Sequence, residues 1–236
     1  VTVVDGLPVT RQANAPYKTS GQWWRDSDGM AHKGVLLVEV DPGEGLPHVE
    51  VYSTHLFAGG GWIPGPGHAD HIRHHEVRMA EADELVAFVE RRHHAGNVVV
   101  VCGDMNVARD DVRLDGDQTA RFRDLSERFA RAGLVDAGQG PGSDTGITSD
   151  LPGGLASVPQ GHPDDPDRVS SDPSDPAQGP PSNTIDHIFV ALDDVATPVT
   201  VGPLQRWMFP RDIGTGKPQR LSDHIAVSVE LTLSPA

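Results

Sequence analysis

The sequence has little cysteine and no long apolar run. Its one cysteine, Cys102, excludes an internal disulfide and a cysteine-rich metal site. Because Cys102 lies inside a run of valines, we expect it to be a small buried apolar residue. No apolar run approaches the roughly 20 residues that span a bilayer. The N-terminus also lacks the features of a signal peptide, but a mature chain whose signal has been removed would look the same, so the compartment stays open.

Basic residues are also scarce. Lysine and arginine number 19 against 34 aspartates and glutamates, which gives a formal net charge of -15. This balance disfavours a protein that binds nucleic acid through a broad basic surface, because phosphate neutralisation requires lysine and arginine. It does not exclude a nuclease, since bound cations can invert the local field. The length of 236 residues suits one sizeable domain, and we expect residues 1–236 to form it.

The hydrophobic pattern predicts alternating strands and helices. We expect strands over 1–10, 34–40, 48–56, 98–103, 185–192 and 225–233, and helices over 68–94 and 119–132. The order strand, helix, strand predicts an α/β protein. Residues 138–183 are rich in glycine, proline, aspartate and serine, and they predict a long loop that is either functional or disordered.

Polar side chains stand at the ends of four predicted strands. They are His55, Asp104 with Asn106, Asp186, and Asp223 with His224. If the last two of these strands run antiparallel to the first two, all six groups converge on one sheet edge. Taken singly, Asp104 is also typical of a plain turn, and the pair Asp223 and His224 of a helix cap beside a surface histidine. The joint pattern favours a site.

The chemistry of this set indicates phosphate-ester hydrolysis. Asp104, Asn106 and Asp223 offer the hard oxygen ligands that suit Mg²⁺ or Mn²⁺. His55 and His224 can act as base and acid, or donate to a phosphoryl oxygen. Asp186 could hold His224 in its working tautomer, as a carboxylate does in a catalytic triad.

Four short segments, in chain order, resemble one known family. "STHL", "GDMNV", "IDHIFVA" and "LSDHIAV" are similar to motifs of the endonuclease/exonuclease/phosphatase family, which includes pancreatic-type deoxyribonucleases, AP endonucleases, inositol polyphosphate phosphatases and neutral sphingomyelinases. "KGVLLVEV", Arg78 and "AGLVDA" also fit, so the resemblance extends from about Lys33 over most of the chain. It implies a four-layer α/β/β/α sandwich with mixed, largely antiparallel sheets, and a divalent cation, Mg²⁺ or Mn²⁺.

The resemblance also implies roles for the edge residues. His55 would contact or protonate the phosphoryl group. Asp104 and Asn106 would orient the nucleophilic water and the phosphate. Asp223 would bind metal, and His224, paired with Asp186, would act on the scissile phosphate. Whether Asp104 is a base or a metal ligand is left open.

Two family motifs are missing from the sequence. The family has an asparagine on its first strand and, later, a Gln-Glu pair whose glutamate is the main metal ligand, and this chain contains no Gln-Glu dipeptide. We expect that the chain is a fragment; otherwise a second chain supplies that half, or the site has been lost. Alone, the chain is expected to bind metal weakly, to hydrolyse slowly or not at all, and to expose one flank of the sandwich.

Weaker signals come from histidines and tryptophans. Four histidines at the start of the first predicted helix have spacings that can bind Zn²⁺ or Ni²⁺, but we interpret them as a solvated helix start: His68, His71, His74 and His75. His93 and His94, at the end of this helix, are expected to interact favourably with the helix dipole and not to bind a metal. Three tryptophans fall in predicted loops and either anchor those loops to the core, which we favour, or meet lipid or bases: Trp23, Trp24 and Trp62.

Three functions follow from these patterns. The favoured hypothesis is a divalent-cation-dependent phosphodiesterase, with a slight preference for a phospholipid or sphingomyelin head group because of "GDMNV" and the tryptophan loops. The second is a nuclease of the same fold, disfavoured by the acidity. The third is a binding module that has kept the fold and lost the chemistry, supported by the two absent motifs.

Overall fold

The computed structural model describes residues 6–24, 26–43, 45–59, 67–109, 118–145, 148, 161–162, 165–169, 184–219, 222 and 224–235. Its main sheet has six strands in the order β1-β2-β3-β4-β8-β5. These are β1 (Val9–Pro16), β2 (Gly34–Val40), β3 (Val49–His55), β4 (Val98–Asp104), β8 (Asp186–Ala191) and β5 (Val135–Asp136). β3 and β4 are parallel and the other pairs are antiparallel, so the predicted mixed, largely antiparallel sheet is confirmed.

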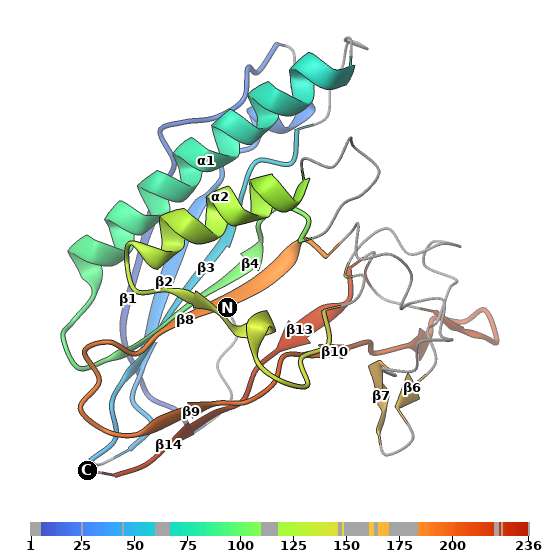
Figure 1. Cartoon of the computed structure of the whole chain (residues 1–236). Helices are drawn as coiled ribbons and strands as arrows, with labels where there is room; N and C mark the ends of the chain where they lie inside the picture. The colour runs from blue at the N-terminus through green and yellow to red at the C-terminus, as the bar shows by residue number, and fades with distance from the viewer. Residues whose placement is uncertain are drawn as a thin grey trace.

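Two helices cover one face of this sheet (Figure 1). α1 (Gly67–Arg92) connects the parallel strands β3 and β4, and α2 (Gln118–Ala130) follows β4. Leu85 and Met79 of α1 pack with Phe122 and Phe129 of α2 in one buried cluster against the sheet. No helix in the described part of the chain combines the length and hydrophobicity needed to cross a membrane.

Short strands cover the opposite face of the sheet. Two of them, β14 (Leu231–Leu233) and β9 (Val199–Val201), pair with each other. A further sheet has the order β13-β10-β7-β6, formed by β13 (Ala226–Ser228), β10 (Gln205–Trp207), β7 (Asp165–Val169) and β6 (Gly161–His162). A small hairpin joins β11 (Arg211–Asp212) and β12 (Pro218–Gln219), and two 3-10 turns occupy Ser27–Met30 and Ala137–Gln139.

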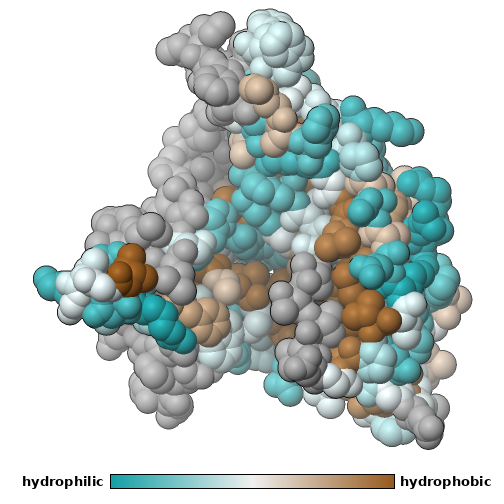
Figure 2. All heavy atoms as spheres, turned by 180° about the vertical axis from the view of Figure 1, so that it is seen from behind, coloured by the Kyte–Doolittle hydropathy of each residue, from teal (hydrophilic) through white to brown (hydrophobic). Residues whose placement is uncertain are grey.

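The valine run of β4 explains this layering. Val99 and Val101 belong to the cluster under the helices, whereas Val98 and Val100 belong to a second cluster that includes Leu204. A strand buried on both faces needs apolar residues at consecutive positions, because successive side chains point to opposite faces. The described residues therefore form three layers, α/β/β, and the fourth layer implied by the resemblance is not among them. Figure 2 shows hydrophobic surface on the side of the molecule seen from behind.

Several sequence predictions need correction. The first described strand lies at Val9–Pro16 and overlaps the expected strand over 1–10 only at residues 9–10, because "TRQANAP" alternates only small alanines with polar residues and gave no clear signal. Residues 1–5 lie outside the described residues. The predicted strand over 225–233 is split into β13 and β14, which belong to different sheets. The range 138–183 contains β6 and β7 in its described part, so it is not loop throughout. The strands at 34–40, 48–56, 98–103 and 185–192 and both helices are confirmed to within a few residues.

Candidate functional site

The register of the main sheet brings three polar residues to one edge. His55 ends β3 and is the neighbour of Asp104, which ends the parallel strand β4. β8 runs antiparallel to β4, so its first residue, Asp186, is the cross-strand partner of Asp104. Two carboxylates and an imidazole therefore lie together because three strands stop or start at the same level.

His224 reaches this edge from the segment before β13. Its Nδ1 atom lies 2.9 Å from Oδ2 of Asp186, and its Nε2 atom lies 3.9 Å from Oδ2 of Asp104. On the other side of Asp104, Nε2 of His55 lies 3.3 Å from the same oxygen. If Nδ1 of His224 donates its proton to Asp186, the Nε2 atom of His224 faces the site and is able to accept a proton.

Asn106 is fixed in an unusual backbone conformation beside Asp104. Its φ of 50° lies in the left-handed region, which asparagine tolerates better than most residues. Its backbone N–H donates to Oδ1 of Asp104 at 2.8 Å, and its side-chain Nδ2 donates to the carbonyl of Leu56 at 2.9 Å. The amide is thereby oriented, and its Oδ1 atom accepts no hydrogen bond from the described residues.

Gly103 allows β3 and β4 to approach closely just before the site. Its φ is 141°, and a Cβ atom at this position would lie 1.9 Å from the carbonyl oxygen of Thr54 on β3. Any side chain would push the two strands apart. Glycine at position 103, in the "GDMNV" segment, therefore allows the close strand pairing that places His55 next to Asp104.

The electrostatics of the edge favour a bound cation. Burial and the neighbouring charge of Asp186 raise the pKa of Asp104, while Asn106, His55 and His224 act in the opposite direction. No lysine or arginine forms an ion pair with Asp104 or Asp186 among the described side chains. Two adjacent carboxylates and an amide oxygen are the ligands preferred by Mg²⁺ and Mn²⁺, so the residues present fit such an ion.

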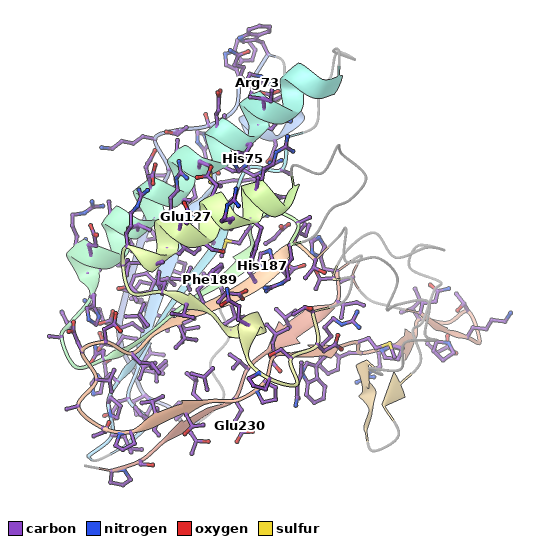
Figure 3. All side chains as sticks on the ribbon, viewed as in Figure 1. Arg73, His75, Glu127, His187, Phe189 and Glu230 are labelled. Atoms are coloured by element: carbon purple, nitrogen blue, oxygen red, sulfur yellow. The ribbon has the colours of Figure 1, made fainter. Side chains whose placement is uncertain are left out.

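Five of the six predicted site residues thus lie together, namely His55, Asp104, Asn106, Asp186 and His224. Asp223, the predicted metal ligand, lies outside the described residues. His187, next to Asp186, points the other way. It is fully buried, lies near Phe189 (Figure 3), and its Nε2 atom contacts the carbonyl of Val107 at 2.7 Å. Burial lowers the pKa of His187 to about 4, so it remains a neutral core residue.

Thr148 supports the site and was not predicted. It is fully buried, and its hydroxyl accepts hydrogen bonds from the backbone N–H groups of Ile185 and Asp186 at 3.1 and 3.2 Å. Its carbonyl accepts from the N–H of Ile225 at 2.7 Å. Thr148 therefore joins the start of β8 to the segment that contains His224. No sequence signal distinguishes it within the range predicted as a long loop.

The segment after His55 is held by charged side chains that were also not assigned to the site. Nζ of Lys33 donates to the same Leu56 carbonyl as Asn106, at 2.8 Å. From α1, Nε of Arg78 donates to the carbonyl of Phe57 at 2.8 Å, and Glu81 accepts from the N–H of Phe57 at 2.7 Å. These contacts give Lys33, Arg78 and Glu81 a structural role in holding the segment that follows His55.

An apolar pocket opens beside His224. It has a volume of about 300 Å³, and its lining includes Trp207, Met208, Phe209 and Ile225 together with Asp186 and His224. A substrate phosphate at the edge would place its attached group close to these side chains. An apolar or aromatic group would fit such a lining.

A second group of possible metal ligands lies at the other end of the sheet. Oxygen or nitrogen atoms of Glu39, Glu50 and His94 lie within 4.8 Å of one another. However, Arg11 already joins the two buried carboxylates, with Nε 2.7 Å from Glu39 and Nη2 2.8 Å from Glu50. His48 and His93 also contact them, at 2.7 and 3.4 Å. Arg11 therefore supplies the positive charge that these two carboxylates require.

The weaker histidine and tryptophan signals have mixed outcomes. His74 is buried against Asp26, so the interpretation as a solvated helix start is wrong for this residue. His75, which also falls on the apolar face of the helix, is half-buried and contacts Asp124. Trp23 and Trp24 are 70% and 56% exposed, so they do not anchor their loop to the core. The side chains of His68 and His71, and Trp62, lie outside the described part.

Comparisons with known proteins agree with the observed fold. The model of a family described as the endonuclease/exonuclease/phosphatase family matches residues 14–224. No curated protein sequence matches the chain. Similar solved structures include sphingomyelinase C from Streptomyces griseocarneus, with 16% identity and a TM-score of 0.53, covering 94% of this chain and 64% of that one.

Two further structures show the breadth of the likeness. A beta toxin variant from Staphylococcus aureus with bound magnesium ions has 18% identity and a TM-score of 0.56, over 94% of this chain and 64% of the toxin. D. rerio TDP2 complexed with a single-strand DNA product has 14% identity and a TM-score of 0.54, over 96% of this chain and 68% of that one. At these identities the likeness concerns the fold. The chain spans about two thirds of the length of these structures.

Proposed function

The chain belongs to the endonuclease/exonuclease/phosphatase family, and from this premise we propose that it is a divalent-cation-dependent phosphodiesterase. The observation that carries the proposal is the contact chain of Asp186, His224, Asp104 and His55 at one sheet edge. Two imidazoles that flank a carboxylate suit acid–base chemistry at a phosphate.

Each side chain has a role in this proposal. Asp186 fixes the ring of His224, so that Nε2 of His224 acts on the scissile phosphate. Asp104, whose pKa is raised by burial and by Asp186, is suited to accept a proton from water or to hold a cation. His55 contacts the phosphoryl oxygens, and the fixed amide of Asn106 orients the phosphate.

Asp104, together with Asp223, would hold Mg²⁺ or Mn²⁺. When bound, such an ion polarises the phosphoryl group and lowers the pKa of water. The Gln-Glu motif that supplies the family's main metal ligand is absent from the sequence. We therefore expect weak metal binding by this chain alone, and activity that requires high cation concentrations or a second polypeptide that completes the site.

Within this class we favour a phospholipid or sphingomyelin head group as substrate. The exposed Trp23 and Trp24 and the apolar pocket beside His224 suit a substrate presented at a lipid interface. The net charge of -15 opposes a broad nucleic-acid surface. A nuclease is the second candidate, supported by the fold shared with a DNA-bound structure.

The test is hydrolysis of bis-p-nitrophenyl phosphate, with Mg²⁺ or Mn²⁺ and with EDTA. We expect cation-dependent release of nitrophenol that His224→Ala lowers by at least about a hundredfold, since acid–base groups contribute about 10²–10⁴-fold. His32→Ala, a change at an exposed histidine, is the matched control and should keep the activity. A folded His224→Ala variant with full activity would refute the assignment.

Two natural substrates then separate the candidates. Release of phosphocholine from sphingomyelin vesicles, without acid-soluble nucleotides from DNA, supports the lipid substrate. The reverse result supports the nuclease. If neither natural substrate nor the nitrophenyl ester is cleaved at any Mg²⁺ or Mn²⁺ concentration, the result supports the inactive binding module.

A further inference from the structure

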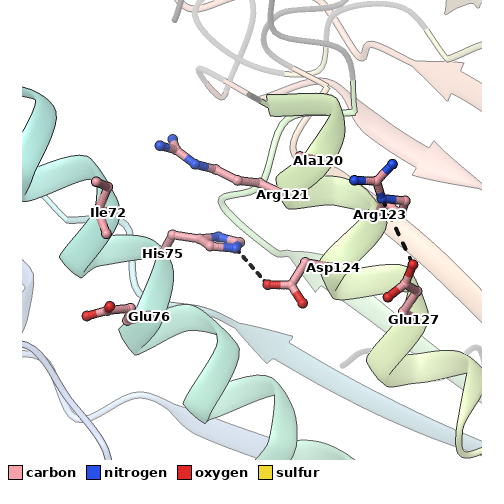
Figure 4. A pocket seen from close by; sticks show the side chains of 8 residues that line it. All are labelled: Ile72, His75, Glu76, Ala120, Arg121, Arg123, Asp124 and Glu127. Atoms are coloured by element: carbon pink, nitrogen blue, oxygen red, sulfur yellow. Dashed lines mark hydrogen bonds and ion pairs between the residues drawn. The ribbon is translucent and has the colours of Figure 1, made fainter. Parts of the chain in front are cut away.

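Two hollows of the molecule differ in the chemistry of their lining. The groove of about 540 Å³ between α1 and α2 is lined mainly by charged side chains, several of which pair with one another (Figure 4). Nε2 of His75 lies 3.0 Å from Asp124, and Nε of Arg123 lies 4.0 Å from Glu127. The pocket of about 300 Å³ beside His224 is instead mainly apolar, and it shares residues with the candidate catalytic edge.

One wall of this apolar pocket is held in place relative to His224. Trp207 on β10 is the cross-strand partner of Ala226 on β13, which lies two residues after His224. The indole Nε1–H of Trp207 also donates to Oγ of Ser228 at 2.6 Å. Cross-strand partners have their side chains on the same face of a sheet, and so do every second residue of a strand. The ring of Trp207 is therefore fixed beside Ala226, close to the histidine that is proposed to act at the phosphate.

The small side chain of Ala226 leaves space that larger neighbours enclose. Ala226 is exposed and ends at its Cβ atom. Met208 and Ile225 also line the pocket and are buried, so they close its inner side, whereas Phe209 is 48% exposed at its rim. A larger side chain at position 226 would occupy the space beside Trp207.

The pocket offers no charged partner to a polar substituent. Among the described residues, neither lysine nor arginine lines it. The carboxylate in its lining, Asp186, lies 2.9 Å from Nδ1 of His224 and is engaged by that ring. A second phosphate or an ammonium group would lose hydration there without gaining an opposite charge. An alkyl or aryl group would instead bury apolar surface.

We propose that this pocket binds an alkyl or aryl group that is esterified to the substrate phosphate, and that Trp207 and Ala226 determine this specificity. The inference rests on the proposed function, because His224 and Asp186 belong both to the catalytic edge and to the pocket lining. A phosphate held beside His224 directs one of its ester groups toward Trp207. In a phospholipid this group is the lipid side of the phosphate, and its apolar surface, not a charged head group, selects the substrate in this pocket.

The test compares the binding of two simple diesters by isothermal titration calorimetry in buffer with Mg²⁺. Dimethyl phosphate and diphenyl phosphate have the same single charge and differ in apolar area. We expect diphenyl phosphate to bind at least about tenfold more tightly, because a phenyl ring buries far more apolar surface than a methyl group. Equal affinities, or no detectable binding of either ester, would overturn the proposal.

Variants of the pocket locate the binding site. Ala226→Leu should abolish the preference for diphenyl phosphate by filling the space beside Trp207, while the affinity for dimethyl phosphate stays the same. Ala196→Leu, the same change at an exposed alanine outside the pocket, should keep the preference. Trp207→Ala should also weaken the binding of diphenyl phosphate. Because position 226 is exposed, Ala226→Leu should unfold at the temperature of the wild type, and a preference that survives in this folded variant would overturn the proposal.

The outcomes for binding and for turnover are separable. Preferential binding of diphenyl phosphate that Ala226→Leu removes, without any hydrolysis of bis-p-nitrophenyl phosphate, would support the pocket and refute the proposed function. Hydrolysis by a protein that binds the two simple diesters equally would support the function and overturn the pocket. Tighter binding of glycerophosphocholine than of diphenyl phosphate would assign Trp207 and Phe209 to an ammonium group, and it would also overturn the proposal.

Discussion

At the scale of single residues, the site depends on side chains whose protonation is set by burial. Glu81 is the clearest example. It is 1% exposed, and burial raises its pKa to about 7, although the N–H of Phe57 and the charge of Lys33 act in the opposite direction. Between about pH 4.5 and 7 the folded protein therefore holds a proton that the unfolded chain has released.

This difference predicts a pH-dependent stability. The contribution of Glu81 is fully present below about pH 4.5 and is lost as the pH rises through about 7, a change of roughly 3 kcal/mol in the free energy of unfolding. Glu81→Gln keeps an acceptor for Phe57 and should flatten this part of the profile, measured by urea denaturation at several pH values.

Glu84, which lies about one turn after Glu81 on α1, is the matched control. Although burial opposes it, hydrogen bonds from Lys18 and Thr19 lower the pKa of Glu84, so its contribution is present above its unfolded pKa and is lost as the pH falls. Glu84→Gln should therefore change the profile with the opposite sign. A Glu81→Gln profile parallel to that of the wild type would contradict the assigned pKa.

Residues at strand ends could be predicted from the sequence, whereas residues that hold them could not. His55, Asp104 and Asp186 each follow or precede a strongly apolar strand, so their place at an edge follows from the strand itself. Thr148 and Arg78 act through hydrogen bonds with the backbone of other segments. Such contacts depend on the folded chain and leave no periodic signal.

At the scale of elements, long strands could be predicted from the sequence and short strands could not. The strands with continuous or alternating apolar residues were predicted, whereas β9 and β10 have three residues each and pair with distant partners. Most of β1 was not predicted, because it is an edge strand with small and polar residues. Its attachment to the sheet depends partly on one charged residue.

Arg11 is that residue, and its removal should destabilise the fold. Its guanidinium contacts the buried carboxylates of Glu39 and Glu50 and also donates to the carbonyl of Arg92 at the end of α1. Arg11→Met leaves two buried charges without their cation, which should cost about 3 kcal/mol of unfolding free energy in chemical denaturation. Arg91→Met, at an exposed position, is the control.

The positive charge in the cluster of Glu39, Glu50 and His94 comes either from Arg11 or from a metal ion, and zinc distinguishes the two. If Arg11 is the cation of the cluster, zinc should leave the Tm of the wild type unchanged. A metal would instead hold this end of the sheet if zinc raised the Tm and Glu50→Gln abolished the rise. In that case the Arg11→Met variant should also keep the unfolding free energy of the wild type.

At the scale of the whole molecule, the distribution of exposed groups bears on the substrate. The chain is acidic, yet two large aromatic side chains, Trp23 and Trp24, are exposed on the loop between β1 and β2. This loop lies at the end of the sheet that carries the site, since Gly21 and Asp26 lie close to Phe57, two residues after His55. Indole rings prefer the interface between lipid and water.

Changing both tryptophans should therefore separate membrane contact from chemistry. We expect Trp23→Ala with Trp24→Ala to reduce hydrolysis of sphingomyelin vesicles by about tenfold or more, because each ring lost from an interface weakens binding by the order of 1 kcal/mol. Hydrolysis of soluble bis-p-nitrophenyl phosphate should be unchanged, since both rings are largely exposed and no contact with the catalytic edge is found among the described residues. Met30→Ala, which alters another exposed apolar residue nearby, provides the comparison. An equal loss on both substrates would assign the tryptophans to the fold of the site, and no loss on vesicles would remove the main structural support for a lipid substrate.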